Sequence, residues 1–134
     1  MIYLATPYTH PDVEVRKNRY REAVAVAYRL TVNGHNIFSP IIATHEMGNQ
    51  FNLPYDYAFW ENWCHDFISS SKVFLACCMD GWEDSAGVSK ESSYARSINV
   101  PVRFLWKDDL YMPDEDLAKF AFHEFPQSGD KWTL

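Results

Sequence analysis

The order of apolar and polar residues along this chain alternates between two patterns. Short apolar runs, typical of strands, occupy residues 2–5, 36–38, 73–79 and 101–106. Apolar positions spaced three or four residues apart predict helices over about residues 12–33, 55–70, 84–98 and 114–122. Strands that alternate with helices indicate an α/β fold around a mainly parallel sheet. No linker or internal repeat is visible, so residues 1–134 are expected to form a single domain.

The first helix has the clearest boundaries. Asp12 is expected to be its N-cap, and Gly34 is expected to end it. Its N-terminal half is basic, which we interpret as a solvated face rather than a binding patch. Residues 41–54 are expected to form an irregular loop. A loop of this length in a compact domain is usually functional, so we expect a lid or a segment that faces a substrate.

One acidic residue interrupts an apolar helix face. The stripe on the helix after the third strand comprises Val88, Glu91, Ala95 and Ile98. A carboxylate on this stripe faces the protein, where an unpaired charge is costly. The helix also begins beyond the carboxyl end of a strand, where open α/β sheets bind ligands. Glu91 is therefore expected either to act on a ligand or to pair with an arginine that braces the sheet, and spacing favours neither.

The start of the same helix is suited to an anion. Ser85 is expected to be its N-cap, and Gly87 lets a ligand approach the backbone closely. Free N–H groups and the positive end of a helix favour a phosphate. A ligand anchored there would place a second atom against Glu91, which lies one to two turns deeper.

A second acid, Asp66, lies among aromatic residues of the preceding helix. Because this helix leads into the third strand, we expect Asp66 to face the same crevice as Glu91, with a solvated position as the alternative. Tyr3 and Tyr8 flank the end of the first strand, although each alone is weak evidence for a site.

Composition narrows the partners. The net charge of −6 argues against polymeric nucleic acid, because few cations are available to neutralise phosphates. No apolar run approaches the ~20 residues that cross a bilayer, and no secretion signal is visible, so we expect no membrane partner. The adjacent Cys77 and Cys78, in a predicted strand, are expected to be core residues in a reducing cytoplasm.

Motifs for metals and common cofactors are incomplete or missing. His45 and Glu46 begin an HExxH pattern, but Asn49 stands where the second histidine is needed. The chain has no GxGxxG or Walker A sequence. We therefore expect no metal and no cofactor.

Two motifs and the acid between them point to a known group. Residues 3–8 read YLATPY, residues 80–91 read DGWEDSAGVSKE, and Asp66 precedes the third strand. Together they resemble the nucleoside 2-deoxyribosyltransferase superfamily, and most closely a small uncharacterised family within it. The likeness spans about residues 1–106, and the second motif is the more specific.

The resemblance implies a flavodoxin-like three-layer sandwich that cleaves the N-glycosidic bond of a nucleoside or nucleoside 5′-monophosphate, with a 2′-deoxy sugar favoured. By likeness, Glu91 matches the nucleophile, Asp66 the acid that holds or protonates the base, and Tyr3 a neighbour of the nucleophile. Ser85 matches a serine that contacts the 5′-phosphate. Asp84 next to it would restore the transferase pattern after a shift of one residue. A homo-oligomer is implied as well.

Three further residues complete the expected substrate site, namely Gly87, Tyr8 and Trp82. Trp82 is expected either to stack on the base or to serve the core. The chain departs from the resemblance where residues 6–10 contain no arginine and where Ser93 replaces a common glycine. The base, the sugar, and the choice between hydrolysis and transfer stay open. The alternatives are a nucleotide-binding module without catalysis and a structural protein.

Overall fold

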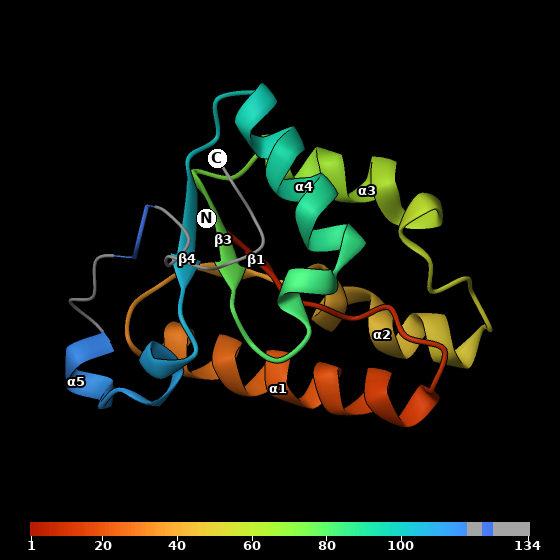
Figure 1. Cartoon of the computed structure of the whole chain (residues 1–134), viewed down its shortest axis with the longest axis horizontal. Helices are drawn as coiled ribbons and strands as arrows, with labels where there is room; N and C mark the ends of the chain where they lie inside the picture. Colours follow the sequence, from red (N-terminus) through yellow and green to blue (C-terminus); the bar gives the residue numbers. More distant parts are fainter. Residues whose placement is uncertain (118–121, 125–134) are drawn as a thin grey trace.

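The computed structural model of the chain describes residues 1–117 and 122–124. In chain order the elements are β1 (Ile2–Ala5), α1 (Val13–Val32), β2 (Ile37–Phe38), α2 (Pro40–Gln50), α3 (Tyr57–Ser69), β3 (Val73–Cys77), the 3-10 turn η1 (Trp82–Asp84), α4 (Ala86–Ser97), β4 (Val102–Leu105), the 3-10 turn η2 (Asp108–Tyr111) and α5 (Asp114–Leu117) (Figure 1). All four predicted strands and the helices around them are present.

The four strands form one parallel sheet in the order β2-β1-β3-β4. In the register of the two central strands, Ile2 lies opposite Val73 and Ala5 lies opposite Ala76. This strand order is that of flavodoxin-like proteins, and it reverses direction between β1 and β3. The carboxyl ends of β1 and β3 therefore diverge into loops on either side of a crevice.

Helices cover both faces of the sheet (Figure 1). Alternate residues of the central strands point to opposite faces. On one face, Leu30 of α1 packs with Leu4 and Leu75. On the other, α3 and α4 pack side by side over Tyr3 and Phe74. The chain is thus a flavodoxin-like three-layer α/β sandwich, as predicted.

The predicted loop over residues 41–54 is wrong, because its first part is the helix α2. Ser39 is its N-cap, and the hydroxyl accepts a hydrogen bond from the Ile42 amide at 3.2 Å. Pro40 occupies the first helical position, where a missing N–H costs nothing. The sequence pair Ser39-Pro40 closes the strand and also begins a helix. Helix α2 packs against α1 and forms one wall of the crevice described below.

The basic N-terminal half of α1 was expected to be a solvated face, but two of its arginines bind the preceding loop. Arg19 donates to the carbonyl oxygens of Tyr8 and Thr9 at 3.3 and 3.0 Å. Arg16 donates to the carbonyl of His10 and lies over the Tyr55 ring, 4.1 Å from its centroid. These contacts hold the loop between β1 and α1. The expected N-cap Asp12 is confirmed, since it accepts from the Glu14 amide at 2.9 Å.

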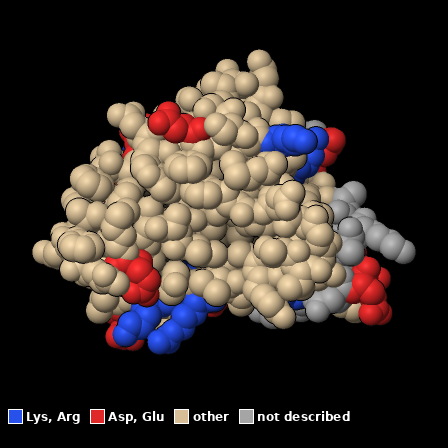
Figure 2. Space-filling view, turned by 180° about the vertical axis from the view of Figure 1, so that it is seen from behind, with Lys and Arg blue, Asp and Glu red and all other residues tan. Residues whose placement is uncertain are grey.

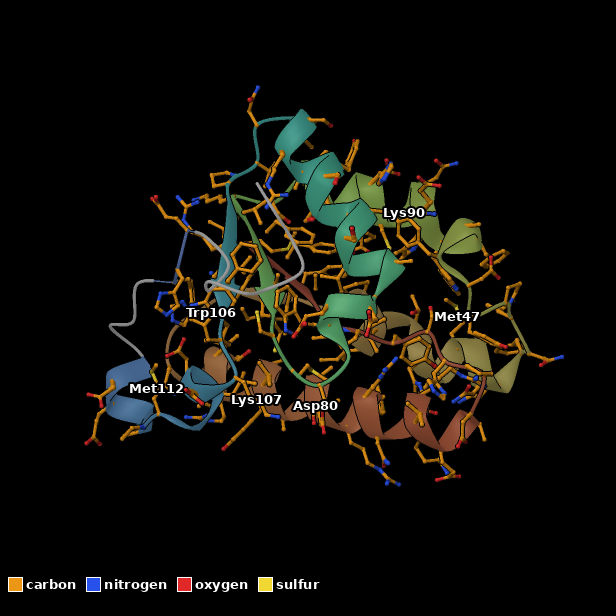
Figure 3. All side chains as sticks on the ribbon, in the orientation of Figure 1. Met47, Asp80, Lys90, Trp106, Lys107 and Met112 are labelled. Carbon is orange, nitrogen blue, oxygen red and sulfur yellow. The ribbon has the colours of Figure 1, made fainter. Side chains whose placement is uncertain are left out.

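The described residues after β4 do not line the crevice. His123 pairs with Phe104 in one antiparallel bridge at the β4 edge of the sheet. Lys107 binds Asp80 at 2.7 Å and ties the loops after β4 and β3 together (Figure 3). The helix predicted over 114–122 is present as Asp114–Leu117, and its remainder lies largely outside the described residues. None of the helices in the described part has the length and apolar character needed to span a bilayer.

Candidate active site

A pocket opens at the carboxyl edge of the sheet, where β1 and β3 diverge. It holds about 570 Å³ when the space that opens to solvent is counted. Its walls come from the loop after β1, from α2, from α3 and from the start of α4. The residues that line it include Thr6, Tyr8, Ile41, Thr44, Tyr55, Tyr57, Trp60, Trp63, Cys64, Ser85, Gly87, Val88 and Glu91.

Glu91 lies in this pocket and is only 7% exposed. Burial raises the pKa of its carboxyl from 4.5 to about 7, and interactions with Tyr3 and Cys64 oppose the shift. Among the described residues, no lysine or arginine forms an ion pair with it. The described residues therefore do not support the alternative in which Glu91 pairs with an arginine to brace the sheet. A buried, unpaired carboxyl in a pocket is a candidate for chemistry.

Tyr3 and Cys64 are polar side chains that interact with Glu91. Tyr3 is fully buried and stacks on Phe74, with ring centroids 5.5 Å apart. Burial, reinforced by the charge of Glu91, raises the pKa of the Tyr3 hydroxyl well above its usual value. That hydroxyl makes no hydrogen bond of ordinary geometry with any described group, although it lies close enough to Glu91 for their charges to interact. Tyr3 thus lies near Glu91.

The prediction that Asp66 faces the Glu91 crevice is wrong. Its side chain is exposed and does not line the pocket. Cys64, two positions earlier on α3, takes the inward place instead and is 3% exposed. Two positions along a helix correspond to a rotation of roughly 200°, so both residues cannot face the sheet. Burial and the nearby Glu91 raise the pKa of the Cys64 thiol to about 12, so this thiol stays protonated.

The start of α4 lines part of the pocket. Ser85 is its N-cap, as predicted, and accepts from the Val88 amide at 3.2 Å. A hydroxyl that accepts here still carries a proton that it can donate to a ligand. A side chain added at Gly87 would meet the Tyr57 ring at 3.6 Å and Ser85 at 3.9 Å, so the glycine keeps this space free. Asp84, also predicted to contact substrate, is exposed and lies outside the pocket lining.

The aromatic wall comes from α3 rather than from η1. Trp60 and Trp63 line the pocket, as does Tyr57. Lys90 of α4 reaches over the Tyr57 ring, 5.6 Å from its centroid (Figure 3). Trp82, predicted as a substrate contact, is 5% exposed and packs on Phe104 and Trp106 in the core. The core role weighed for Trp82 is the one observed.

Sequence reasoning missed several residues of the pocket. Thr6 directly follows β1, and its buried hydroxyl has no partner among the described groups. Its position directly after the first strand, where the strand order of the sheet reverses, could have identified it from the sequence. His45 was considered only as a metal ligand, yet it binds the Tyr8 hydroxyl at 2.8 Å. Arg16 supplies the positive charge that residues 6–10 lack, because α1 folds back along that loop.

Within the described ranges, no group of three or more His, Cys, Asp or Glu side chains lies close enough together to hold a metal ion. The lining offers instead one acid, several hydroxyls and several aromatic rings. Such a set suits an uncharged or anionic organic molecule with a planar part. The face seen in Figure 2 is largely uncharged at its centre, with basic and acidic groups at its margins.

Fold and site define a class: a flavodoxin-like α/β protein with one buried carboxyl in a small-molecule pocket at the switch point of its sheet. The chain belongs to the family described as domain of unknown function (DUF1937), whose model matches residues 1–108. That span contains every residue of the pocket. No curated protein matches the chain.

Proposed function

We propose that this protein cleaves the N-glycosidic bond of a nucleoside or nucleoside 5′-monophosphate, with Glu91 as the nucleophile. The observation that carries the proposal is the Glu91 carboxyl, buried in an aromatic pocket without a cationic partner in the described chain. The resemblance of residues 80–91 to the nucleoside 2-deoxyribosyltransferase superfamily supports the same role.

The chemistry suits the residues. Breaking a C1′–N bond passes through a state with positive charge on the sugar, which a close carboxylate stabilises or captures covalently. The aromatic rings of Trp60 and Trp63 suit the flat base, and their bulk excludes water. The Ser85 hydroxyl at the helix start suits a 5′-phosphate. The glycosyl group then passes to water or to a second base.

One observation favours a second candidate, a nucleotide-binding module without turnover. Because Asp66 lies outside the pocket, Glu91 is the only carboxyl in its described lining. A departing base then needs a proton from some other group. If no such group acts, the pocket would hold a nucleotide and leave it intact.

The test is release of free base from a panel of ribo- and deoxyribonucleosides and their 5′-monophosphates, followed by mass spectrometry. Wild-type protein should release base from at least one member. Glu91→Gln should lower that rate by at least about 100-fold, the lower end of what a positioned catalytic group contributes. Glu22→Gln, an exposed position on α1, is the matched control and should act like wild type.

Saturable binding with no base released, measured by calorimetry and chromatography of the recovered ligand, would establish the binding module instead. Equal rates for wild type and Glu91→Gln would reject Glu91 as the nucleophile. If no nucleotide of the panel shifted the melting temperature, both candidates would be rejected and a structural role would remain.

A further inference from the structure

Tyr8 is held in the pocket by a chain of hydrogen bonds that does not include Glu91, the proposed nucleophile. Its hydroxyl lies 2.8 Å from Nδ1 of His45, and Nε2 of that histidine lies 3.1 Å from the amide nitrogen of Asn49. His45 is 5% exposed and stacks on Tyr20, with centroids 4.0 Å apart. Arg19 fixes the backbone of the Tyr8 loop from the other side.

The direction of these hydrogen bonds follows from donor chemistry. An amide nitrogen only donates, so Nε2 of His45 must accept from Asn49. Burial lowers the pKa of His45, which keeps the ring neutral, with its single proton on Nδ1. Nδ1–H therefore donates to the Tyr8 oxygen. The Tyr8 O–H hydrogen is left free for a ligand in the pocket, which Tyr8 and Glu91 both line.

Tyr57, another tyrosine of the pocket, makes a useful contrast. Tyr57 also contacts a histidine, but its hydroxyl lies 3.4 Å from Nε2 of His65. The same Nε2 lies 3.9 Å from the Glu61 carboxylate, and 23% of the His65 side chain is exposed. Nothing in this pair assigns the proton of Tyr57. Tyr8, unlike Tyr57, combines a short hydrogen bond, a buried histidine and a defined direction.

We propose that Tyr8 is the acid that protonates the departing base, with His45 and Asn49 as positioning residues. The inference rests on the proposed function and supplies the proton donor that Asp66 does not provide. Arg16 lies close enough to stabilise the tyrosinate, since its charge lowers the pKa of Tyr8 against the stronger rise caused by burial. Glu46 adds a smaller rise to that pKa.

The two steps balance. In the first, a Glu91 oxygen bonds to C1′, the C1′–N bond breaks with its electron pair going to the base, and the Tyr8 proton moves to the base. Tyr8 is left as a tyrosinate that accepts from Nδ1–H of His45. In the second, a water oxygen attacks C1′, its proton returns to Tyr8, and the ester bond electrons return to Glu91. A second base with an N–H serves in place of water.

The experiment varies the leaving group, using substrates of one sugar whose bases differ in basicity, including an N7-methylated purine that departs without a proton. Tyr8→Phe should lower the rate by about 100-fold or more on unmethylated bases, as expected for loss of a general acid. On the N7-methylated substrate the loss should be less than about 5-fold. Asn49→Leu, which removes the donor to Nε2 at an exposed helix position, should show the same pattern with a smaller loss.

Tyr57→Phe is the matched control, because whatever rate it loses should be the same for both kinds of base. Equal losses for Tyr8→Phe on both kinds of base would overturn the acid role while the nucleophile remains established by Glu91→Gln. An unchanged rate for Tyr8→Phe would overturn it as well. Absence of turnover by the wild type would remove the proposed function and the acid role together.

Discussion

Glu91 shows that one side chain can be favourable for chemistry and unfavourable for folding. The pocket removes water from its carboxyl, and the only compensation among described groups is the nearby Tyr3 hydroxyl and Cys64 thiol. An acid whose pKa is raised to about 7 by burial binds its proton more tightly in the native state than in the unfolded chain. Active sites commonly carry such a cost in stability.

Glu91→Gln should therefore be more stable than wild type, but only at higher pH. Between about pH 4.5 and 7 the native protein keeps a proton that the unfolded chain has released, so native stability falls as pH rises through this window. The amide carries no charge and avoids this loss. The gain in unfolding free energy should grow from near zero at pH 4.5 to on the order of 3 kcal/mol at pH 8.

Urea unfolding at several pH values measures this difference. Glu22→Gln is the control, because an exposed carboxylate is solvated in both states and its loss should give no such trend. A Glu91→Gln protein that is less stable than wild type at pH 8 would contradict a buried, uncompensated carboxylate.

The same pKa sets the expected pH dependence of catalysis. In the proposed reaction, Glu91 attacks C1′ as the carboxylate, so kcat/KM should increase about tenfold per pH unit below pH 7 and level off above it. A pH profile of base release between pH 5 and 9 measures this limb. A profile that is flat across pH 7 would show that Glu91 titrates elsewhere or does not attack.

At the scale of elements, α2 contributes to the pocket in two ways. It carries Thr44, which lines the pocket, and His45, which holds Tyr8. The helix begins at the Ser39-Pro40 pair, which joins an N-cap hydroxyl to a proline at the first helical position. That pair was visible in the sequence, but the weak amphipathic pattern that follows it does not distinguish a helix from a loop.

Ser39→Ala should reduce the unfolding free energy by about 1 kcal/mol, because it removes the acceptor for the Ile42 amide. Chemical denaturation measures this loss of stability. If the substitution shifts α2, the rate of base release should fall as well. Ser39→Asp should restore part of the stability, since aspartate also caps helices. Ser93→Ala on the exposed side of α4 is the control and should be neutral or slightly stabilising. A neutral Ser39→Ala would mean that α2 does not depend on this cap.

At the scale of the whole molecule, exposed aromatic residues gather where α2 leads into α3. Phe51, Tyr55 and Phe59 are 72%, 44% and 51% exposed, and Tyr55 also lines the pocket. Large exposed aromatic side chains are typical anchors of protein interfaces. The homo-oligomer implied by the resemblance would place a second copy of the chain on this segment.

Sedimentation equilibrium measures the assembly. Wild type should form a dimer or higher oligomer, and Phe59→Ser should weaken it by about 30-fold, which corresponds to ~2 kcal/mol for one interface anchor. Tyr28→Ser is the control on α1, where the side chain is 66% exposed and lies on another element. A monomeric wild type would exclude this segment as the interface. An assembly weakened by Tyr28→Ser and unaffected by Phe59→Ser would exclude it as well.

The sequence by itself determined the parts of this protein that local pattern controls. Alternating apolar runs predicted the parallel α/β fold, and the N-cap Ser85 followed by Glu91 on an apolar stripe predicted the buried acid. These features are local, because capping and helical periodicity depend on residues within a few positions of each other.

Only the tertiary structure decided which side chains share the pocket. Asp66 and Cys64 lie two positions apart on the helix before the third strand, and the rotation of α3 against the sheet turned the cysteine inward and the acid outward. The pairing of Tyr8 with His45 joins residues 37 positions apart, through a helix that sequence pattern did not predict. The rotation of a packed helix depends on all of its contacts with other elements, and no short segment of the chain contains that information.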